Sequence, residues 1–194
     1  EGTLTYLVEE MVGPGDKRTP YSFVNAVTPS PASPVPEDMG KAEIAVNEWA
    51  RRNLSLSKGD SLRMSYLVLG DTGAFTRVSR SFRVHGFFSM EVAARESAFM
   101  PAFPGLSDVE SCRSWDIGMP MREEDLADPD NEQYWQQFRT APKALIRLDA
   151  GREMWGNRYG EITSVRLPSA EYSVNGVTEI LRNQVSPAAV GLGI

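Results

Sequence analysis

The chain has few of the residue types that most often carry out chemistry in proteins. Its 194 residues include one cysteine, Cys112, and one histidine, His85. A single cysteine excludes an intrachain disulfide, and one residue of each type cannot supply a typical zinc site. Cys112 and His85 form the only possible Cys-His pair, and the chain has neither a nucleophile elbow nor a phosphate loop. We therefore expect no catalytic residue, no metal and no cofactor.

The sequence also lacks any apolar run close to the ~20 residues that cross a bilayer. It begins at Glu1 without a charged and apolar leader, so we expect residues 1–194 to be a single domain from a longer protein. A net charge of −6 argues against a nucleic-acid surface, which needs a basic patch. The hydrophobic content of 41% and charged content of 24% are ordinary for a globular domain and argue against disorder.

What the sequence does contain is a regular stretch from Glu43 to Phe88. Ile44–Val46 reads as a strand, and Asn47 is placed to cap a short helix from Glu48 to Leu54. After a Gly-Asp turn, apolar and polar residues alternate in two further strands, which predicts a hairpin with one face on a core. The apolar positions are Leu62, Met64, Tyr66 and Val68 in the first strand, and Phe82 and Val84 in the second.

Regular elements are also expected on both sides of this stretch. Strands are predicted at Thr3–Val8, Pro20–Val27, Lys143–Leu148 and Glu161–Leu167. Asp149 is expected to cap a short helix that ends at Trp155, and apolar residues from Val177 to Val185 recur at helical spacing. A proline-rich surface loop should occupy Thr28–Asp38. The predicted fold is α+β, with a mixed sheet of short strands, a few short helices and a proline-rich irregular insertion.

The insertion, at about 91–141, has dispersed prolines and no regular period. One short helix is expected near Glu132–Phe138, and aromatic side chains should hold the rest in place. These anchors are Phe99, Phe103, Trp115, Trp135 and Phe138.

The insertion is also where we expect contact with a partner. Its remaining outward surface should be acidic, so a basic or polar partner surface is favoured over an anionic lipid. The candidate partner-contact residues are Trp115, Asp116, Glu123, Glu124, Asp125, Tyr134 and Trp135, and Asp128 and Asp130 should also face outward. For the aromatic members the alternative is that they pack the insertion onto its own domain. The acidic run from Asp125 to Glu132 could instead hold a calcium ion, although it lacks the EF-hand spacing and contains a stiffening proline.

The order of the regular elements resembles the extracytoplasmic core domain of the MacB/FtsX/LolC class of ABC-transporter permeases. That class has an apolar strand, a polar residue, a short helix with Ala, a Leu-x-Leu, a Gly-Asp turn, and a hairpin closing on apolar-x-Val-x-Gly. The corresponding residues here are Ile44–Val46, Glu48, Ala50, Leu54 and Leu56, Gly59-Asp60, and Phe82–Gly86. Residues 143–185 continue with the strand, short helix, strand and amphipathic helix of that class. The segment Pro20–Ser22 is similar to a Pro-Tyr-Ser segment in a bacterial subgroup.

The resemblance implies a MacB-like core domain on the extracytoplasmic (periplasmic) side of the cell membrane, tethered by transmembrane helices of the parent protein. A fused or separate cytoplasmic ABC ATPase would be its partner through those helices. The domain itself would be non-catalytic, and would couple ATP hydrolysis to export, lipoprotein release or activation of an extracytoplasmic protein partner. No nucleic acid is implied. The alternative is a free-standing secreted ligand-binding module or hydrolase.

Overall fold

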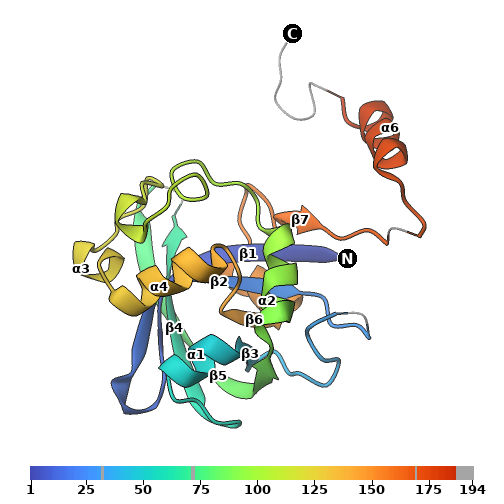
Figure 1. The fold of residues 1–194 in the computed structure, drawn as a ribbon. Coiled ribbons are helices and arrows are strands. Elements are labelled where there is room, and N and C mark those ends of the chain that lie inside the picture. Colours follow the sequence, from blue (N-terminus) through green and yellow to red (C-terminus); the bar gives the residue numbers. More distant parts are fainter. Residues whose placement is uncertain (32, 71–72, 169, 187–194) are drawn as a thin grey trace.

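The computed structural model describes residues 1–31, 33–70, 73–168 and 170–186. The strands in these ranges are β1 (Gly2–Val12), β2 (Arg18–Val27), β3 (Glu43–Asn47), β4 (Ser61–Leu69), β5 (Phe75–Phe88), β6 (Ala144–Arg147) and β7 (Ser164–Val165). The α-helices are α1 (Glu48–Asn53), α2 (Met90–Glu96), α3 (Glu123–Leu126), α4 (Pro129–Phe138), α5 (Leu148–Trp155) and α6 (Val174–Gln184). Figure 1 shows α6 standing off from the body formed by the other elements.

The sheet closes on itself into a six-stranded barrel. The strands follow the order β2-β6-β3-β5-β4-β1, and β1 pairs again with β2, while β7 is added at the start of β1. The pairs β2–β6 and β3–β5 are parallel, whereas the other four pairs of the barrel are antiparallel. The α+β class and the mixed sheet are therefore confirmed. The stretch from Glu43 to Phe88 lies in the same sheet as β6 and β7, as the sequence predicted.

The barrel consists of two halves with the same connectivity. The first half is β1, β2, β3 and α1, and the second half is β4, β5, β6 and α5. Each half begins with an antiparallel hairpin and places its second strand parallel to the third strand of the other half. The first strands of the two halves meet where Met11 pairs with Met64, and both side chains are fully buried. Exchanging the halves leaves the pairing scheme unchanged.

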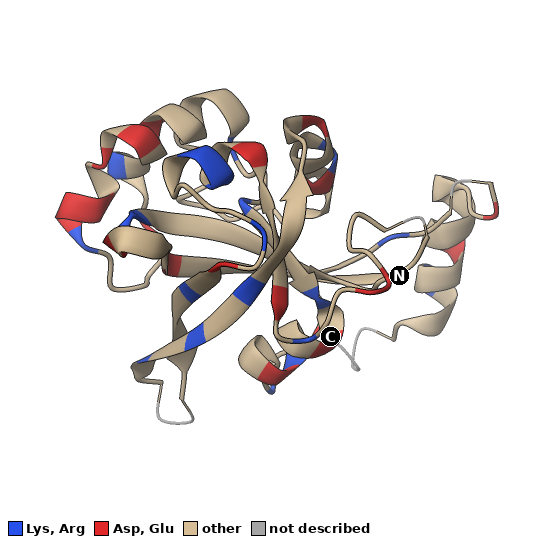
Figure 2. Ribbon diagram, turned by 90° about the horizontal axis from the view of Figure 1, so that it is seen from below, with Lys and Arg blue, Asp and Glu red and all other residues tan. Residues whose placement is uncertain are grey.

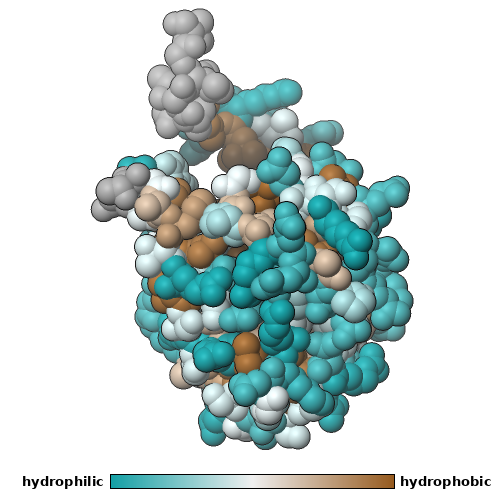
Figure 3. All heavy atoms as spheres, turned by 90° about the vertical axis from the view of Figure 1, so that its left-hand side faces the viewer, coloured by the Kyte–Doolittle hydropathy of each residue, from teal (hydrophilic) through white to brown (hydrophobic). Residues whose placement is uncertain are grey.

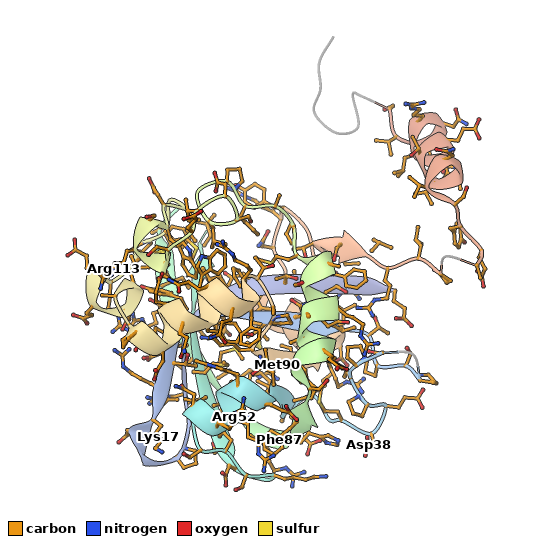
Figure 4. The ribbon with its side chains drawn as sticks, in the orientation of Figure 1. Lys17, Asp38, Arg52, Phe87, Met90 and Arg113 are labelled. Carbon is orange, nitrogen blue, oxygen red and sulfur yellow. The ribbon has the colours of Figure 1, made fainter. Side chains whose placement is uncertain are left out.

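The helices α1 and α5 close the two ends of the barrel. Each follows its strand directly, and because β3 and β6 are antiparallel the helices lie at opposite ends. Ala50 and Leu54 of one end, and Met154 and Trp155 of the other, belong to one buried cluster that also contains Met11. Figure 4 places Lys17 and Arg52 together at the end closed by α1.

The predicted helix start at Asn47 is confirmed, because its side-chain oxygen accepts a hydrogen bond from the Ala50 amide at 2.8 Å. The predicted cap at Asp149 is wrong. Arg147 precedes the first helical residue, and Asp149 lies in the first turn, where it forms an ion pair with Arg147. The β3–β5 register shifts between Val84 and Gly86 and leaves His85 as an extra residue, which bends β5 at this point.

Two other expectations need correction. The insertion is more regular than predicted, because Ser89 caps α2 by accepting from the Val92 amide and three acidic residues open α3. The strand expected at Glu161–Leu167 is reduced to the two paired residues of β7. The amphipathic helix near the C-terminal end is confirmed as α6.

We predict that Gly151→Ala destabilises the fold, although alanine is normally the better helix former. A Cβ atom at Gly151 would lie 2.3 Å from the Ala26 Cβ of β2, so α5 would have to move away from the barrel. Overpacking of this kind costs about 1–3 kcal/mol of the free energy of unfolding. Urea denaturation measures the loss, and the double variant Ala26→Gly/Gly151→Ala should recover part of it. A single variant as stable as the wild type would contradict the close approach.

Candidate functional site

The insertion, residues 91–141, lies on the outer face of the barrel, with one part over β1 and β2 and another over β2, β3 and β6. Its aromatic side chains meet Tyr21 and Phe23 of β2 in a buried cluster separate from the barrel interior. The rings of Trp115 and Trp135 are 5.0 Å apart, edge to face, and Trp115 also contacts Tyr21 and Phe23 with centroids 6.3 and 6.5 Å away. Such pairs add to the stabilisation from apolar burial. These tryptophans therefore fasten the insertion to its own barrel.

Tyr134 of α4 is buried in the same way. Its hydroxyl donates to the Ala141 carbonyl and accepts from the Asn47 side chain, both at 2.9 Å, and burial raises its pKa. Tyr134, Trp115 and Trp135 cannot touch a partner while the insertion is docked on the barrel. These aromatic residues therefore follow the alternative, in which they pack the insertion onto its own domain. Phe103, expected to be an anchor, is instead 42% exposed.

Asp125 was expected to face outward, and this expectation is wrong. Its side chain is fully buried between two guanidinium groups, with Oδ1 at 2.6 Å from Arg18 of β2 and Oδ2 at 2.5 Å from Arg122. A buried carboxylate needs such partners, and Arg18 supplies one from the barrel. Asp125 therefore joins α3 to β2.

Three of the predicted contact residues do lie on the surface. Asp116, Glu123 and Glu124 are exposed, and acidic segments mark α3 and α4 in Figure 2. The face that carries α3 is mainly hydrophilic (Figure 3). Asp116, Glu123 and Glu124 remain the candidate residues for contact with a polar or basic partner.

The acidic run that could have held calcium has other partners. Asp128 caps α4 by accepting from the Asn131 amide at 2.8 Å, and Asp130 accepts from Asn53 of α1 at 3.1 Å. Glu132 accepts from the Cys112 amide at 2.8 Å. Across the described ranges, no cluster of His, Cys, Asp and Glu is arranged to hold a metal ion.

The residue that the sequence analysis missed is Lys143, the buried lysine just before β6. Its Nζ donates to the Asn131 side chain at 2.6 Å, to the Thr19 hydroxyl at 2.8 Å and to the Pro20 carbonyl at 3.4 Å. Three acceptors match the three donors of an ammonium group. The rings of Trp49 and Tyr134 face the same nitrogen at 4.8 and 4.9 Å.

Lys143 thus joins the insertion, β2 and α1 at one buried point. Burial lowers its pKa to about 7, against nearby negative groups that raise it. The sequence held one signal for it, a lysine directly before the apolar run Ala144–Ile146. Such a residue is more often placed at a solvated strand end.

The structure does not bring Cys112 and His85 together. The Cys112 sulfur lies among Asn131 and Glu132, and burial raises its pKa to about 12. His85 instead has Nδ1 at 3.1 Å from Glu43 and Nε2 at 3.6 Å from Asp38. A thiol with a raised pKa is a poor nucleophile at neutral pH.

A small apolar pocket of about 180 Å³ opens beside the insertion. Residues of β1, including Tyr6 and Leu7, form its floor, and Phe103, Ile117 and Met119 of the insertion form its walls. The volume is below the roughly 300–1,000 Å³ of pockets that enclose drug-sized ligands.

Comparison with known proteins adds no relative: no protein-family profile matches the chain, and no curated protein matches it.

We predict that Asp125→Asn weakens the attachment of the insertion. It removes the charge that faces Arg18 and Arg122, which are partly exposed and also lie near Glu10, so we expect a loss of about 1–3 kcal/mol of the free energy of unfolding. Urea denaturation measures this loss. The matched controls are Glu123→Gln and Glu124→Gln, which remove the same charge from exposed sites and should stay within about 0.5 kcal/mol of wild type. Equal effects at buried and exposed positions would contradict the role of Asp125.

A second prediction concerns the pH dependence of stability. The pKa of Lys143 is about 7 in the folded chain, and that of an unfolded lysine is about 10.4. The unfolded chain therefore binds more protons between these values, so stability should rise with pH by up to about 1.4 kcal/mol per unit.

Urea denaturation between about pH 7 and pH 8 tests this, because the unfolded Cys112 thiol has a pKa of about 8.5 and ionises mainly above that range. In Lys143→Met this part of the rise should disappear. A wild-type profile that is flat, or that falls, would show that the cage of acceptors and rings keeps the ammonium charged.

Proposed function

We propose that this chain is the extracytoplasmic core domain of an ABC-transporter permease of the MacB/FtsX type. In this role it is non-catalytic, and it passes movements of the parent's transmembrane helices to a partner or exported substrate outside the membrane. The resemblance between Ile44 and Gly86 supports the proposal, because its residues occupy the positions expected of them. Ala50 of α1 and Leu54, which directly follows α1, face the core, and Phe82 and Val84 face it from β5.

The observation that carries the proposal furthest is the way the chain enters and leaves the barrel. Gly2 pairs with Val165 and Thr3 with Ser164, and the Arg166 amide donates to the Glu1 carbonyl at 2.7 Å. The incoming and outgoing segments therefore run side by side. A domain inserted between two neighbouring transmembrane helices needs this arrangement.

The helix α6 is consistent with a position in which another part of the parent protein, or another molecule, covers it. Several of its apolar residues are exposed, with Val174 at 84%, Leu181 at 55% and Ile180 at 50%. A solitary amphipathic helix gains its stability from whatever covers its apolar face. Within the described residues, no helix has the length and apolar character to span a bilayer.

The partner surface in this proposal is the exposed acidic part of the insertion. Asp116, Glu123 and Glu124 project from a segment that is rigidly attached to the barrel through Asp125 and the buried tryptophans. A rigid attachment lets the surface move with the barrel, which a loosely held loop does not.

The test is the membrane topology of the parent protein. Glu123→Cys in the full-length protein should react with a membrane-impermeant maleimide in spheroplasts before lysis, whereas Cys112 is buried and should not react. The protein should be in the membrane fraction and co-purify with an ABC ATPase, or contain one. Labelling only after lysis would contradict the proposal. A parent protein without membrane association would favour the secreted ligand-binding module or hydrolase.

A further inference from the structure

The short strand β7 is held by more than its pairing with β1. It consists of two residues, both of which pair with β1, and Val165 is 60% exposed. A ladder of this length is weak. Side-chain contacts on both sides of β7 supply the rest of the attachment.

On the upstream side, Thr163 is bound to β1. Its amide donates to the Thr3 carbonyl and its hydroxyl oxygen accepts from the Thr5 amide, both at 2.9 Å. The Thr5 hydroxyl in turn donates to the Asn25 side chain at 2.9 Å, and the Asn25 amide group donates to the Glu96 carbonyl at 3.4 Å. Thr5, Asn25 and Glu96 are all buried.

On the downstream side, Arg166 is bound to the same glutamate. Its Nη2 lies 3.0 and 2.8 Å from the two carboxylate oxygens of Glu96, and its guanidinium stacks on the Phe99 ring at 3.9 Å. The contacts form a closed circuit from Thr163 through Thr5, Asn25 and Glu96 to Arg166. Hydrogen bonds in a buried network reinforce one another, so the circuit favours a single geometry.

Glu96 and Phe99 also determine where the chain goes next. Glu96 is the last residue of α2, and Phe99 ends the 3-10 turn that follows it. From Met100 the chain continues into the irregular part of the insertion. The outgoing strand and the start of the insertion are therefore fastened to one point.

We propose that this circuit is a mechanical joint that couples the outgoing segment to the insertion. A displacement of residues 163–166 is passed through Glu96 and Phe99 to α2 and the residues that follow, instead of peeling β7 from the barrel. Arg166 and Glu96 act as positioning residues in the joint. The coupling is a property of the chain itself. Only the identification of the membrane helices as the source of the displacement rests on the proposed function.

Amide hydrogen exchange on the soluble chain tests the joint in the variant Arg166→Gln. Exchange should be at least about tenfold faster at Thr163 and Arg166, because the buried Glu96 carboxylate loses its partner. It should also be faster at Met100 and Leu106 in the insertion, whereas amides of β3 should exchange as in wild type. The matched control is Arg152→Gln, which removes the same charge from an exposed ion pair with Glu161 and should change none of these rates.

Coupling is reciprocal, so loosening the insertion end of the joint must also speed amide exchange in residues 163–166. Phe99→Ala, which removes the ring and keeps the Arg166–Glu96 pair, should speed exchange at Thr163. Faster exchange confined to residues 163–166 in Arg166→Gln, or an unchanged Thr163 in Phe99→Ala, overturns the proposal. If Arg166→Gln does not fold, Arg166→Lys keeps the charge and should give the same pattern with smaller changes. Membrane topology does not enter these measurements, so failure of the joint and failure of the proposed function are separate results.

Discussion

Closure of the barrel depends on β1, which pairs with three other strands. It runs antiparallel to β2 over most of its length, meets β4 at Glu10–Val12 and receives β7 at Gly2–Thr3. Removing its contact with β2 or with β4 would open the sheet and expose the interior that α1 and α5 close. The register is set by apolar side chains, since a slip of one residue would turn Val8 and Met11 out of the core.

The outer face of β1 and β2 supports a second layer with different chemistry. Trp115 and Trp135 supply apolar area, while Asp125 and Lys143 are buried ionisable groups whose partners come from both the insertion and the barrel. Apolar contacts attach two surfaces without choosing one geometry, whereas a buried charge is tolerated only where its partners are in place. The polar contacts therefore fix the position of the insertion that the aromatic residues hold.

Local features of the fold were predictable from the sequence and long-range ones were not. The Asn47 cap and the alternation at Phe82 and Val84 are short-range patterns with a direct physical cause, and both are present. Barrel closure depends on pairing between strands far apart in the chain, which no local pattern encodes. The inward turn of Asp125 has the same origin, because Arg18 lies in a distant strand and becomes its neighbour only in the folded chain. Composition alone makes such a residue read as solvated surface.

Because the two halves have the same connectivity, the irregular segments of the chain lie at equivalent positions in the fold. The proline-rich loop joins β2 to β3, and the insertion and α2 join β5 to β6, so both occupy the same crossover in their respective halves. A barrel of two identical repeats satisfies the same pairing scheme, which is what gene duplication followed by fusion produces. In such a protein the two crossovers can diverge in length and chemistry at no cost to the barrel. New surfaces would then arise there, while the duplicated strands stay under a shared constraint.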